Sequence, residues 1–389
     1  MSDRPRQSLR PVPLAWRLVS HRKSRAAVAV LGIAFALMVI FVQLGFYGAV
    51  RKTAIAVTSR FNADLVVVSP GFVHLLDTGT FDRARLFQVL AAPGVESATP
   101  LYFRFVNWYD PITSNTCRLF ALGFPLAQAK IVPPLMLDGL TDHLDALAPT
   151  GTILLDRLTQ EKCGPASSAQ IVNINGQISR AVGGFELGVG FLADGSVILS
   201  DDSFSRLFPY ESFDKPHLGL VKLLPGADPS QVAEVLRQQI PEDIRILTRD
   251  ELRVLQEQFW IKNTAVGNIF GLGSLAGFLV GLVVLFQILS TDIRNHLPLY
   301  ATLRAMGYTK RQLSIYVLKQ ALIFAGMGYL PALAVTACLF PAVHWLTKLP
   351  LSMSVNLAIG VAFLGVAMCT TSALLSMGRL RKADPAELF

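Results

Sequence analysis

The sequence NTAVGNIFGLGSLAGFLVGLVVLFQILST, residues 263–291, contains no charged side chain and no histidine. A helix needs roughly 20 mostly apolar residues to cross the hydrocarbon core of a bilayer. Three further runs also lack Asp, Glu, Lys, Arg and His, at residues 26–50, 320–343 and 349–378. The pattern therefore predicts four transmembrane helices.

The composition of the whole chain agrees with this prediction. The chain is 52% hydrophobic, has a mean hydropathy of +0.46 and is only 16% charged, whereas a soluble domain is roughly a quarter charged. The run at 26–50 is far longer than the roughly 7–15 apolar residues of a cleaved signal peptide. We therefore expect it to be retained as the first span.

The basic residues predict the orientation of the chain. Segments 1–25, 292–319 and 379–389 together carry a net charge of +11, whereas residues 51–262 carry −4. Lys and Arg concentrate on the cytoplasmic side of membrane proteins, so both termini and the middle connection are expected in the cytoplasm. The basic balance is a topology signal and does not indicate nucleic-acid binding, which needs basic residues gathered on one folded face.

The fold class that follows is an α-helical membrane protein with four transmembrane helices and a large α+β extracytoplasmic domain between helices one and two. We call residues 51–262 the inserted domain. The expected order is a basic, interfacial N-terminal segment (1–25), a first span (26–50), the inserted domain (51–262), a second span (263–291), a cytoplasmic coupling loop (292–319), a third span (320–343), a short outer loop (344–348), a fourth span (349–378) and a cytoplasmic tail (379–389).

Alternating apolar residues and turn signals indicate several strands in the inserted domain. Asn175-Gly176 lies between two such runs, which is a strong hairpin signal, and Asp228 followed by Pro229 is typical of a helix start. Asp201-Asp202 could bind a cation, but we favour a solvated turn or a helix cap. His74, His143 and His217 have no metal-ligand spacing to one another. We predict no catalytic residue, no metal site and no cofactor of the chain's own.

The cysteines leave one question open. Cys338 and Cys369 fall inside predicted spans, where they are expected to pack as small residues. Cys117 and Cys163 lie in the inserted domain, where a disulfide is chemically permitted. The sequence does not decide whether the two meet.

Residues 248–270 predict a helix that enters the second span. Thr248 followed three residues later by Glu251 is a capping box, and neither Gly nor Pro follows until Gly267. One continuous helix from the inserted domain into the bilayer would act as a stiff rod. The alternative is a helix that ends before the bilayer.

Gly273, Gly277 and Gly281 form a stripe of small residues on one face of the second span. Such stripes let membrane helices approach closely, so we expect a packing seam with the first span or with a second copy of the chain. Ordinary glycine enrichment is the alternative. The spans contain no ionisable side chain at their centres, which argues against a proton or ion transporter.

The segment YATLRAMGYTKRQL, residues 300–313, connects the second and third spans, and we call it the basic segment. Residues 301–306 are expected to be helical, Gly307 to turn the chain and Thr309 to cap the next helix. A short helix, a turn and a second helix suit docking into a cleft of a soluble cytoplasmic partner.

The basic segment resembles the cytoplasmic loop of FtsX/MacB-type permeases, also called type VII or mechanotransmission ABC systems. HRKSRAAVAVLGIAFA (21–36) and RLRKADPAELF (379–389) resemble the first span entry and the tail of the same family. The length of the chain, QLGF at 43–46 and the Met306-Gly307-Tyr308 triplet are most similar to the DevC permeases of cyanobacterial DevBCA-type exporters. Leu299 stands where the family carries an acidic residue, so any salt bridge from that position is missing.

The resemblance implies an assembly. Two permease copies would dock on a separate cytoplasmic ATPase that binds ATP and Mg²⁺, and would work with a periplasmic adaptor and a TolC-like outer-membrane channel. The chain has no G-x-x-x-x-G-K-[ST] motif of its own. The residues implied in ATPase coupling are Arg304, Ala305, Gly307, Tyr308, Lys310 and Arg311.

Three functions follow in order of preference. The first is a permease subunit of an exporter in a bacterial, cyanobacterial-type inner membrane, with a glycolipid, peptide or drug-like cargo left open. The second is an FtsX-like transducer that regulates periplasmic cell-wall enzymes. The third, a membrane enzyme with an outer catalytic domain, would need a Ser, His or Asp cluster that the sequence does not show.

Overall fold

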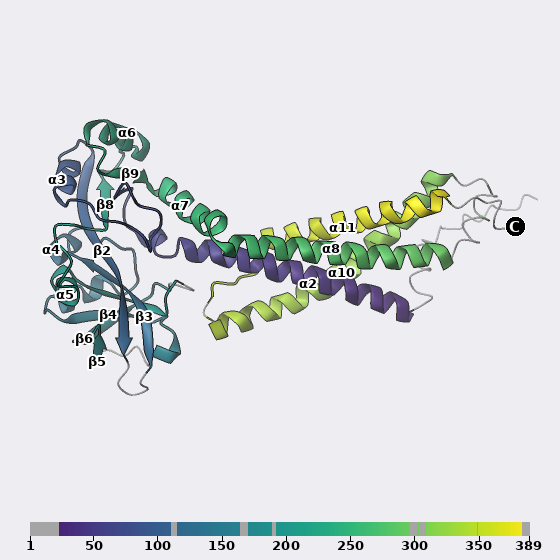
Figure 1. Cartoon of the computed structure of the whole chain (residues 1–389), viewed down its shortest axis with the longest axis horizontal. Coiled ribbons are helices and arrows are strands. Elements are labelled where there is room, and N and C mark those ends of the chain that lie inside the picture. The colour runs from purple at the N-terminus through teal and green to yellow at the C-terminus, as the bar shows by residue number, and fades with distance from the viewer. Residues whose placement is uncertain are drawn as a thin grey trace, which may run out of the picture. The chain divides into compact units, whose positions relative to one another are not determined.

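The computed structural model describes residues 23–109, 115–163, 170–188, 192–295, 302, 306, 309–347 and 349–382. The chain divides into two compact units, and each is described here by itself (Figure 1). The helical unit comprises Met1–Gly48, Asn268–Val343 and Leu351–Phe389, and the second unit, Ala49–Gly267 with His344–Pro350, contains the inserted domain.

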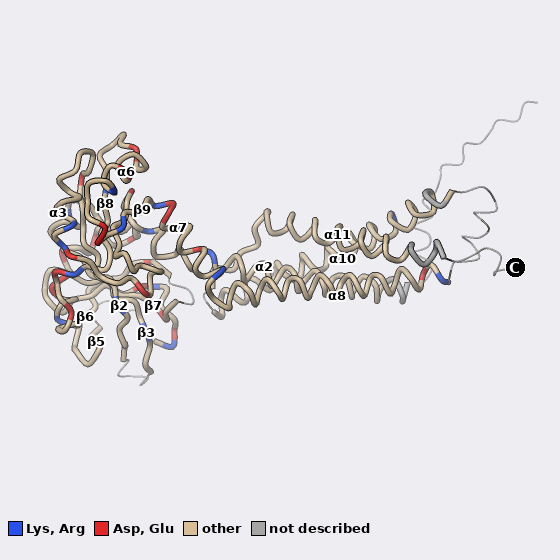
Figure 2. Tube along the Cα trace, turned by 45° about the horizontal axis from the view of Figure 1, so that its top comes forward, with Lys and Arg blue, Asp and Glu red and all other residues tan. Residues whose placement is uncertain are grey.

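The helical unit is built from long apolar helices. They are α2 (Lys23–Ala54), α8 (Ala265–Asn295), α10 (Lys310–Thr347) and α11 (Val355–Lys382). Among the described residues, four helical stretches are long and apolar enough to cross a membrane: Ala27–Ala54, Ala265–Asn295, Gln312–Thr347 and Val355–Ser376. Figure 2 shows that charged residues of these helices lie near their ends. The bundle core includes Ile33 and Leu37 of α2, Leu285 of α8 and Met368 of α11, all fully buried.

The glycine stripe of α8 packs against α2 of the same chain. A Cβ on Gly277 would lie 3.2 Å from side-chain atoms of Ile40 and Val39, and one on Gly281 would lie 2.8 Å from the Cβ of Ala36. Gly273 meets the side-chain amide of Gln43. The sequence allowed this stripe to pack against the first span or against a second copy of the chain. In the structure it packs against the first span.

We predict that Gly277→Leu destabilises the helical unit, because the added side chain must displace Ile40 and Val39. Overpacking typically costs about 1–3 kcal/mol. Gly271→Leu is the matched control, since a Cβ there meets nothing within 4 Å. The measurement is loss of helical circular dichroism during titration with sodium dodecyl sulfate. Equal midpoints for the two variants would show that close approach at Gly277 is unimportant.

The inserted domain is organised around one sheet of nine strands. They are β1 (Leu65–Val68), β2 (Val95–Tyr109), β3 (Thr116–Phe124), β4 (Thr152–Asp156), β5 (Ile171–Ile174), β6 (Gln177–Phe185), β7 (Gly195–Ser200), β8 (Leu218–Leu223) and β9 (Arg245–Thr248). The order is β3-β7-β4-β6-β5-β2-β8-β1-β9, with a further pairing of β3 with β2. The pairings β2–β3–β7–β4–β6–β5–β2 therefore close into a ring of six strands, and β8, β1 and β9 extend from β2.

Short helices complete the domain. They are α3 (Ala84–Leu90), α4 (Leu126–Ala129), α5 (Asp201–Leu207), α6 (Pro229–Gln239) and α7 (Arg249–Gln258), with single 3₁₀ turns at Thr58–Arg60, Thr141–His143, Asp145–Leu147 and Glu161–Cys163. Leu86 of α3 and Leu236 of α6 pack against Leu65 and Val221 in one core. A second core, which includes Trp108, lies among the strands of the ring.

Local sequence signals account for the turns and caps. Asn175 and Gly176 both have positive φ, 50° and 81°, and join β5 to β6 as predicted, because this hairpin turn needs φ above zero at both central residues. Asp228 accepts from the Ser230 N–H at the start of α6. Asp201-Asp202 forms the first turn of α5, which Ser200 caps.

The prediction of one continuous helix into the second span is wrong. The helix changes at Phe259–Asn263 into a π-helix, and Thr264 is extended before α8 begins at Ala265. The Thr264 hydroxyl donates to the Trp260 carbonyl at 2.5 Å. A Cβ on Gly267 would lie 2.7 Å from the carbonyl carbon of Ile261, so glycine is required where the chain turns this closely. π-helical turns insert an extra residue and are rarely signalled by sequence.

Cys117 and Cys163 form a disulfide in the structure. Both residues are buried, and the Trp108 indole N–H donates to the Cys163 carbonyl at 3.0 Å. The bond attaches the Glu161–Cys163 turn to β3.

We predict that replacing both cysteines by alanine lowers the free energy of unfolding by about 2–4 kcal/mol. The bond closes a chain segment of 46 residues, and the loop-entropy relation gives about 4 kcal/mol for that length. The measurement is thermal unfolding of the purified full chain, with reduced wild type as comparison. A variant as stable as oxidised wild type would show that the bond contributes nothing.

Candidate functional site

The basic segment lies largely outside the described residues. Arg304, Ala305, Gly307 and Tyr308 fall there, and Lys310 and Arg311 open α10 without described side chains. The flanking residues are defined. Thr309 and Gln312 form a reciprocal cap, in which the Gln312 N–H donates to the Thr309 hydroxyl at 3.3 Å and the Thr309 N–H donates to the Gln312 Oε1 at 2.9 Å. The prediction that Thr309 begins the helix is confirmed.

The helices on either side of the basic segment are joined by a hydrogen bond that sequence reasoning missed. The Gln320 Nε2 of α10 donates to Asp292 Oδ2 of α8 at 2.8 Å. An acidic residue near a helix C-terminus is electrostatically unfavourable by a few tenths to about 1 kcal/mol, so Asp292 needs a compensating donor. Ile293 and Leu313, both buried, pack in the same core. The helices that enter and leave the basic segment are therefore held in a fixed register.

A second polar seam joins α11 to α8. The Ser372 and Ser376 hydroxyls donate to the carbonyls of Leu282 and Phe286 at 2.9 and 3.4 Å. The two serines are four residues apart, as are their acceptors, so one face of α11 follows one face of α8. This spacing was present in the sequence, but serines in a membrane helix also bond to their own backbone, which made the signal ambiguous.

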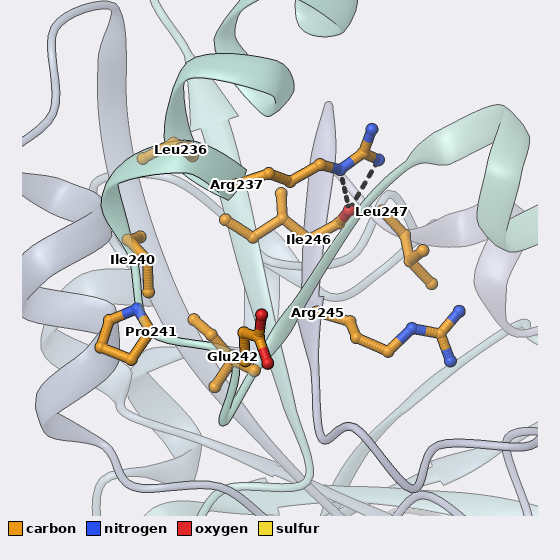
Figure 3. A pocket seen from close by; sticks show the side chains of 9 residues that line it. Leu236, Arg237, Ile240, Pro241, Glu242, Arg245, Ile246 and Leu247 are labelled. Atoms are coloured by element: carbon orange, nitrogen blue, oxygen red, sulfur yellow. Dashed lines mark hydrogen bonds between the residues drawn. The ribbon is translucent and has the colours of Figure 1, made fainter.

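The inserted domain contains a cavity of about 420 Å³ between the end of α6 and strand β9 (Figure 3). Its walls are mostly aliphatic, and three charged residues lie on it. The lining residues are Leu236, Arg237, Ile240, Pro241, Glu242, Ile244, Arg245, Ile246 and Leu247. The cavity shows no pairing of nucleophile and base among these residues.

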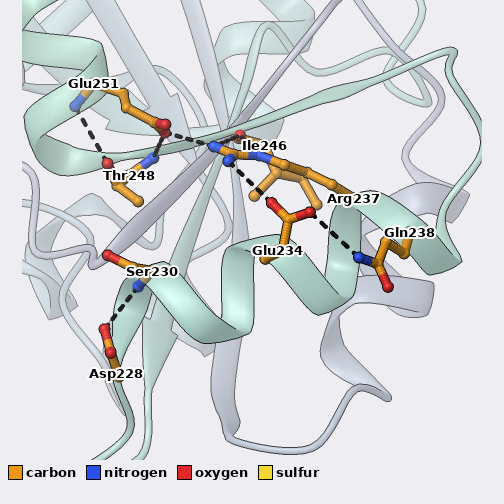
Figure 4. A network of polar contacts seen from close by, with 8 residues as sticks. All are labelled: Asp228, Ser230, Glu234, Arg237, Gln238, Ile246, Thr248 and Glu251. Atoms are coloured by element: carbon orange, nitrogen blue, oxygen red, sulfur yellow. Dashed lines mark hydrogen bonds and ion pairs between the residues drawn. The ribbon is translucent and has the colours of Figure 1, made fainter.

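Arg237 fixes the edge of the sheet beside this cavity. Its guanidinium donates to the Ile246 carbonyl at 3.0 and 2.7 Å and pairs with Glu251 at 2.5 Å (Figure 4). Glu251 in turn accepts from the Thr248 N–H at 2.7 Å. Strand β9 stands at one end of the strand order, and these two side chains occupy backbone groups that another strand could use. Charged side chains on an edge strand guard against unwanted pairing.

Glu251 also forms the predicted capping box of α7 with Thr248. Partial burial acts to raise the pKa of Glu251, but hydrogen bonds from the Thr248 backbone and from Arg237 outweigh it, so the pKa is lowered. The depressed pKa means that the carboxylate contributes stability above its ordinary pKa of 4.5. That contribution is lost as the pH falls further.

We predict that Glu251→Ala lowers stability by about 1 kcal/mol and Glu251→Gln by less, because glutamine can keep the capping box and the exposed ion pair with Arg237 is worth little. The measurement is the melting temperature at pH 7 and at pH 3.5. The gap between wild type and Glu251→Gln should narrow at the lower pH. A gap that widens there would contradict the assigned role of the charge.

The sequence predicts no metal site, and the structure bears on that prediction only through the described residues. Within them, the one group of three close enough to hold an ion is Cys117, Cys163 and Asp194. The two sulfurs of that group are joined to each other. The three histidines occupy separate surroundings: His74 lies against Phe259, His143 near Gly183 and His217 beside Glu211.

These features define a class: a membrane protein with four long apolar helices and an α+β domain inserted after the first of them. A family model described as MacB-like periplasmic core domain matches residues 26–239, and one described as FtsX-like permease C-terminal matches residues 271–385. The first covers more than half of the chain. The chain therefore belongs to the FtsX/MacB family of permeases.

Three solved structures are similar to the chain. The periplasmic region of MacB from Actinobacillus actinomycetemcomitans shares 13% identity with a TM-score of 0.37, over 51% of this chain and 93% of that one. The extracellular domain of the ABC-type transporter YknZ from Gram-positive bacteria shares 10% at 0.35, over 48% and 100%. A domain of a permease protein from Porphyromonas gingivalis shares 17% at 0.30, over 47% and 88%. Comparison with curated proteins gave no match. The family assignment rests on the two family models.

Proposed function

We propose that the chain is the permease subunit of an ABC exporter, which passes conformational change from a separate cytoplasmic ATPase to its inserted domain. Members of the MacB-like family work with a cytoplasmic ATPase. The observation that carries the proposal is the basic segment, which follows α8, runs into the start of α10 and lies inside the match to the FtsX-like permease region. Arg304, Lys310 and Arg311 are the side chains that would meet the ATPase.

The orientation is part of the proposal. Residues 1–25, 292–319 and 379–389 are rich in Lys and Arg, which favours a cytoplasmic position for these three segments. The disulfide between Cys117 and Cys163 favours an oxidising compartment for the inserted domain. The ATPase would then meet the basic segment on one side, and the inserted domain would work on the other.

The wider assembly is likewise proposed: a second copy of the chain, a periplasmic adaptor and a TolC-like outer-membrane channel, with the chain acting as a DevC-type subunit of a cyanobacterial exporter. The apolar helices support movement of cargo outside the helical unit. Their interhelical polar contacts include the bond of Gln320 to Asp292 and the bonds of the α11 serines to α8 carbonyls. Such contacts hold helices together and give a hydrophilic cargo no continuous route.

We predict that Arg304→Glu combined with Arg311→Glu abolishes stimulation of the partner ATPase, because charge reversal would repel the acidic surface that the basic segment is expected to meet. The measurement is ATP hydrolysis by the co-purified complex in nanodiscs. A more than tenfold loss of stimulated rate is expected. Gly307→Pro should give a similar loss through the turn.

Arg379→Glu with Arg381→Glu is the matched control, since it makes the same change of net charge in the cytoplasmic tail. Full stimulation and normal co-purification in the Arg304 and Arg311 double variant would rule out docking through the basic segment. The FtsX-like alternative would be favoured if the wild-type complex hydrolysed ATP and bound a cell-wall hydrolase but no adaptor.

A further inference from the structure

His217 lies where strand β2 changes its neighbour. The first half of β2 pairs with β8 as far as Leu101, opposite Leu218, and its second half pairs with β3 from Tyr102 onward. His217 directly precedes β8, and its backbone N–H donates to the Leu101 carbonyl at 3.2 Å. In the described part of the domain, β2 is the one strand that belongs both to the six-stranded ring and to the β8–β1–β9 extension.

The His217 ring makes a second bond to the same strand. Its Nδ1 accepts from the Phe103 backbone N–H at 3.2 Å, and the residue is fully buried. A ring nitrogen that accepts carries no proton, so the hydrogen-bond network assigns the neutral ring with its proton on Nε2. The Nε2 atom is buried without a hydrogen-bond partner. Glu211 Oε2 is 3.7 Å away.

Two charged groups face the ring. Arg104 comes from β2, and Glu211 comes from the connection between α5 and β8; the two are paired with each other. Burial, assisted by repulsion from Arg104, lowers the pKa of His217 from 6.5 to about 3. Glu211 already pairs with Arg104 and lies 3.7 Å from Nε2, beyond hydrogen-bond distance, so it offsets a charge on the ring only in part.

We propose that His217 is an acid-sensitive latch that holds the six-stranded ring and the β8–β1–β9 extension together at β2, and that acidification releases it. A protonated Nδ1 can no longer accept from Phe103. The Phe103 N–H would then be buried without an acceptor, and the ring would carry a charge in a largely apolar interior; both are unfavourable. Opening of the junction to water removes that cost.

The direction with pH follows from linkage. The closed junction binds a proton at about pH 3, whereas an opened junction binds it near the ordinary value of 6.5. The latch is therefore fully effective above about pH 6.5 and weakens as the pH falls toward 3. The opened population rises about tenfold per pH unit within that window, or about 100-fold between pH 7.5 and 4.5.

The test is hydrogen–deuterium exchange of the full chain in nanodiscs, read by mass spectrometry on peptides that resolve the Phe103 amide. Exchange through local opening reports the opened population. After correction for the intrinsic pH dependence of exchange, the protection of this amide should fall about 100-fold from pH 7.5 to pH 4.5. Unchanged protection in wild type would overturn the proposal.

His217→Gln should remove the pH dependence, because an amide oxygen can accept from Phe103 and does not titrate in this range. His143→Gln, at another histidine of the same domain, should keep it. An equal fall in the His217→Gln variant would overturn the proposal. If that variant does not fold, the amides of strand β1 in wild type serve as the internal comparison. They should keep their protection at pH 4.5. A fall in their protection parallel to that of Phe103 would show global acid unfolding and overturn the proposal.

Discussion

The absence of water in the bilayer is the constraint on which the rest of this structure depends. Backbone groups in the hydrocarbon must bond within their own segment, so uncharged runs of this length have to be helical. Helices between apolar lipid chains gain little from the hydrophobic effect and must pack closely or share polar contacts. Gly277 against Ile40, and Ser372 against the Leu282 carbonyl, are these two solutions in this chain. Chemistry that needs charge is thereby confined to the helix ends and to the inserted domain.

At the end of the helical unit that carries the basic segment, such confinement produces a defined polar contact between two helices. Asp292 is poorly placed for its own helix, since it adds negative charge where the helix dipole is already negative. Gln320 supplies a donor from the next helix at 2.8 Å. The bond offsets the unfavourable position of Asp292 and fixes the two helices on either side of the basic segment.

Much of the fold was predictable because its signals are local. The four uncharged runs, the hairpin at Asn175-Gly176 and the caps at Thr248 and Thr309 depend on residues within a few positions of one another. What sequence reasoning missed or left open depends on partners far away in the chain. Gln320 with Asp292, Phe103 with His217 and Cys117 with Cys163 are each brought together by the fold. The π-helical turn is a third kind of case, because Phe259–Asn263 has ordinary helical propensity and the deviation comes from the packing of the chain around Gly267.

The insertion of a domain between two helices also requires that its two ends come together. Arg51, at the end of α2, donates two hydrogen bonds to Glu257 of α7, and Arg249 donates to the Ser59 carbonyl at 2.7 Å. An exposed ion pair contributes about 1 kcal/mol or less to stability, so these contacts add little to the free energy of unfolding of the domain. They fix where its first and last segments lie relative to each other, and the buried Leu252 in the adjoining core makes that position the stable one. With the interruption at Thr264, the inserted domain ends in a pair of hydrogen-bonded chain segments followed by a turn.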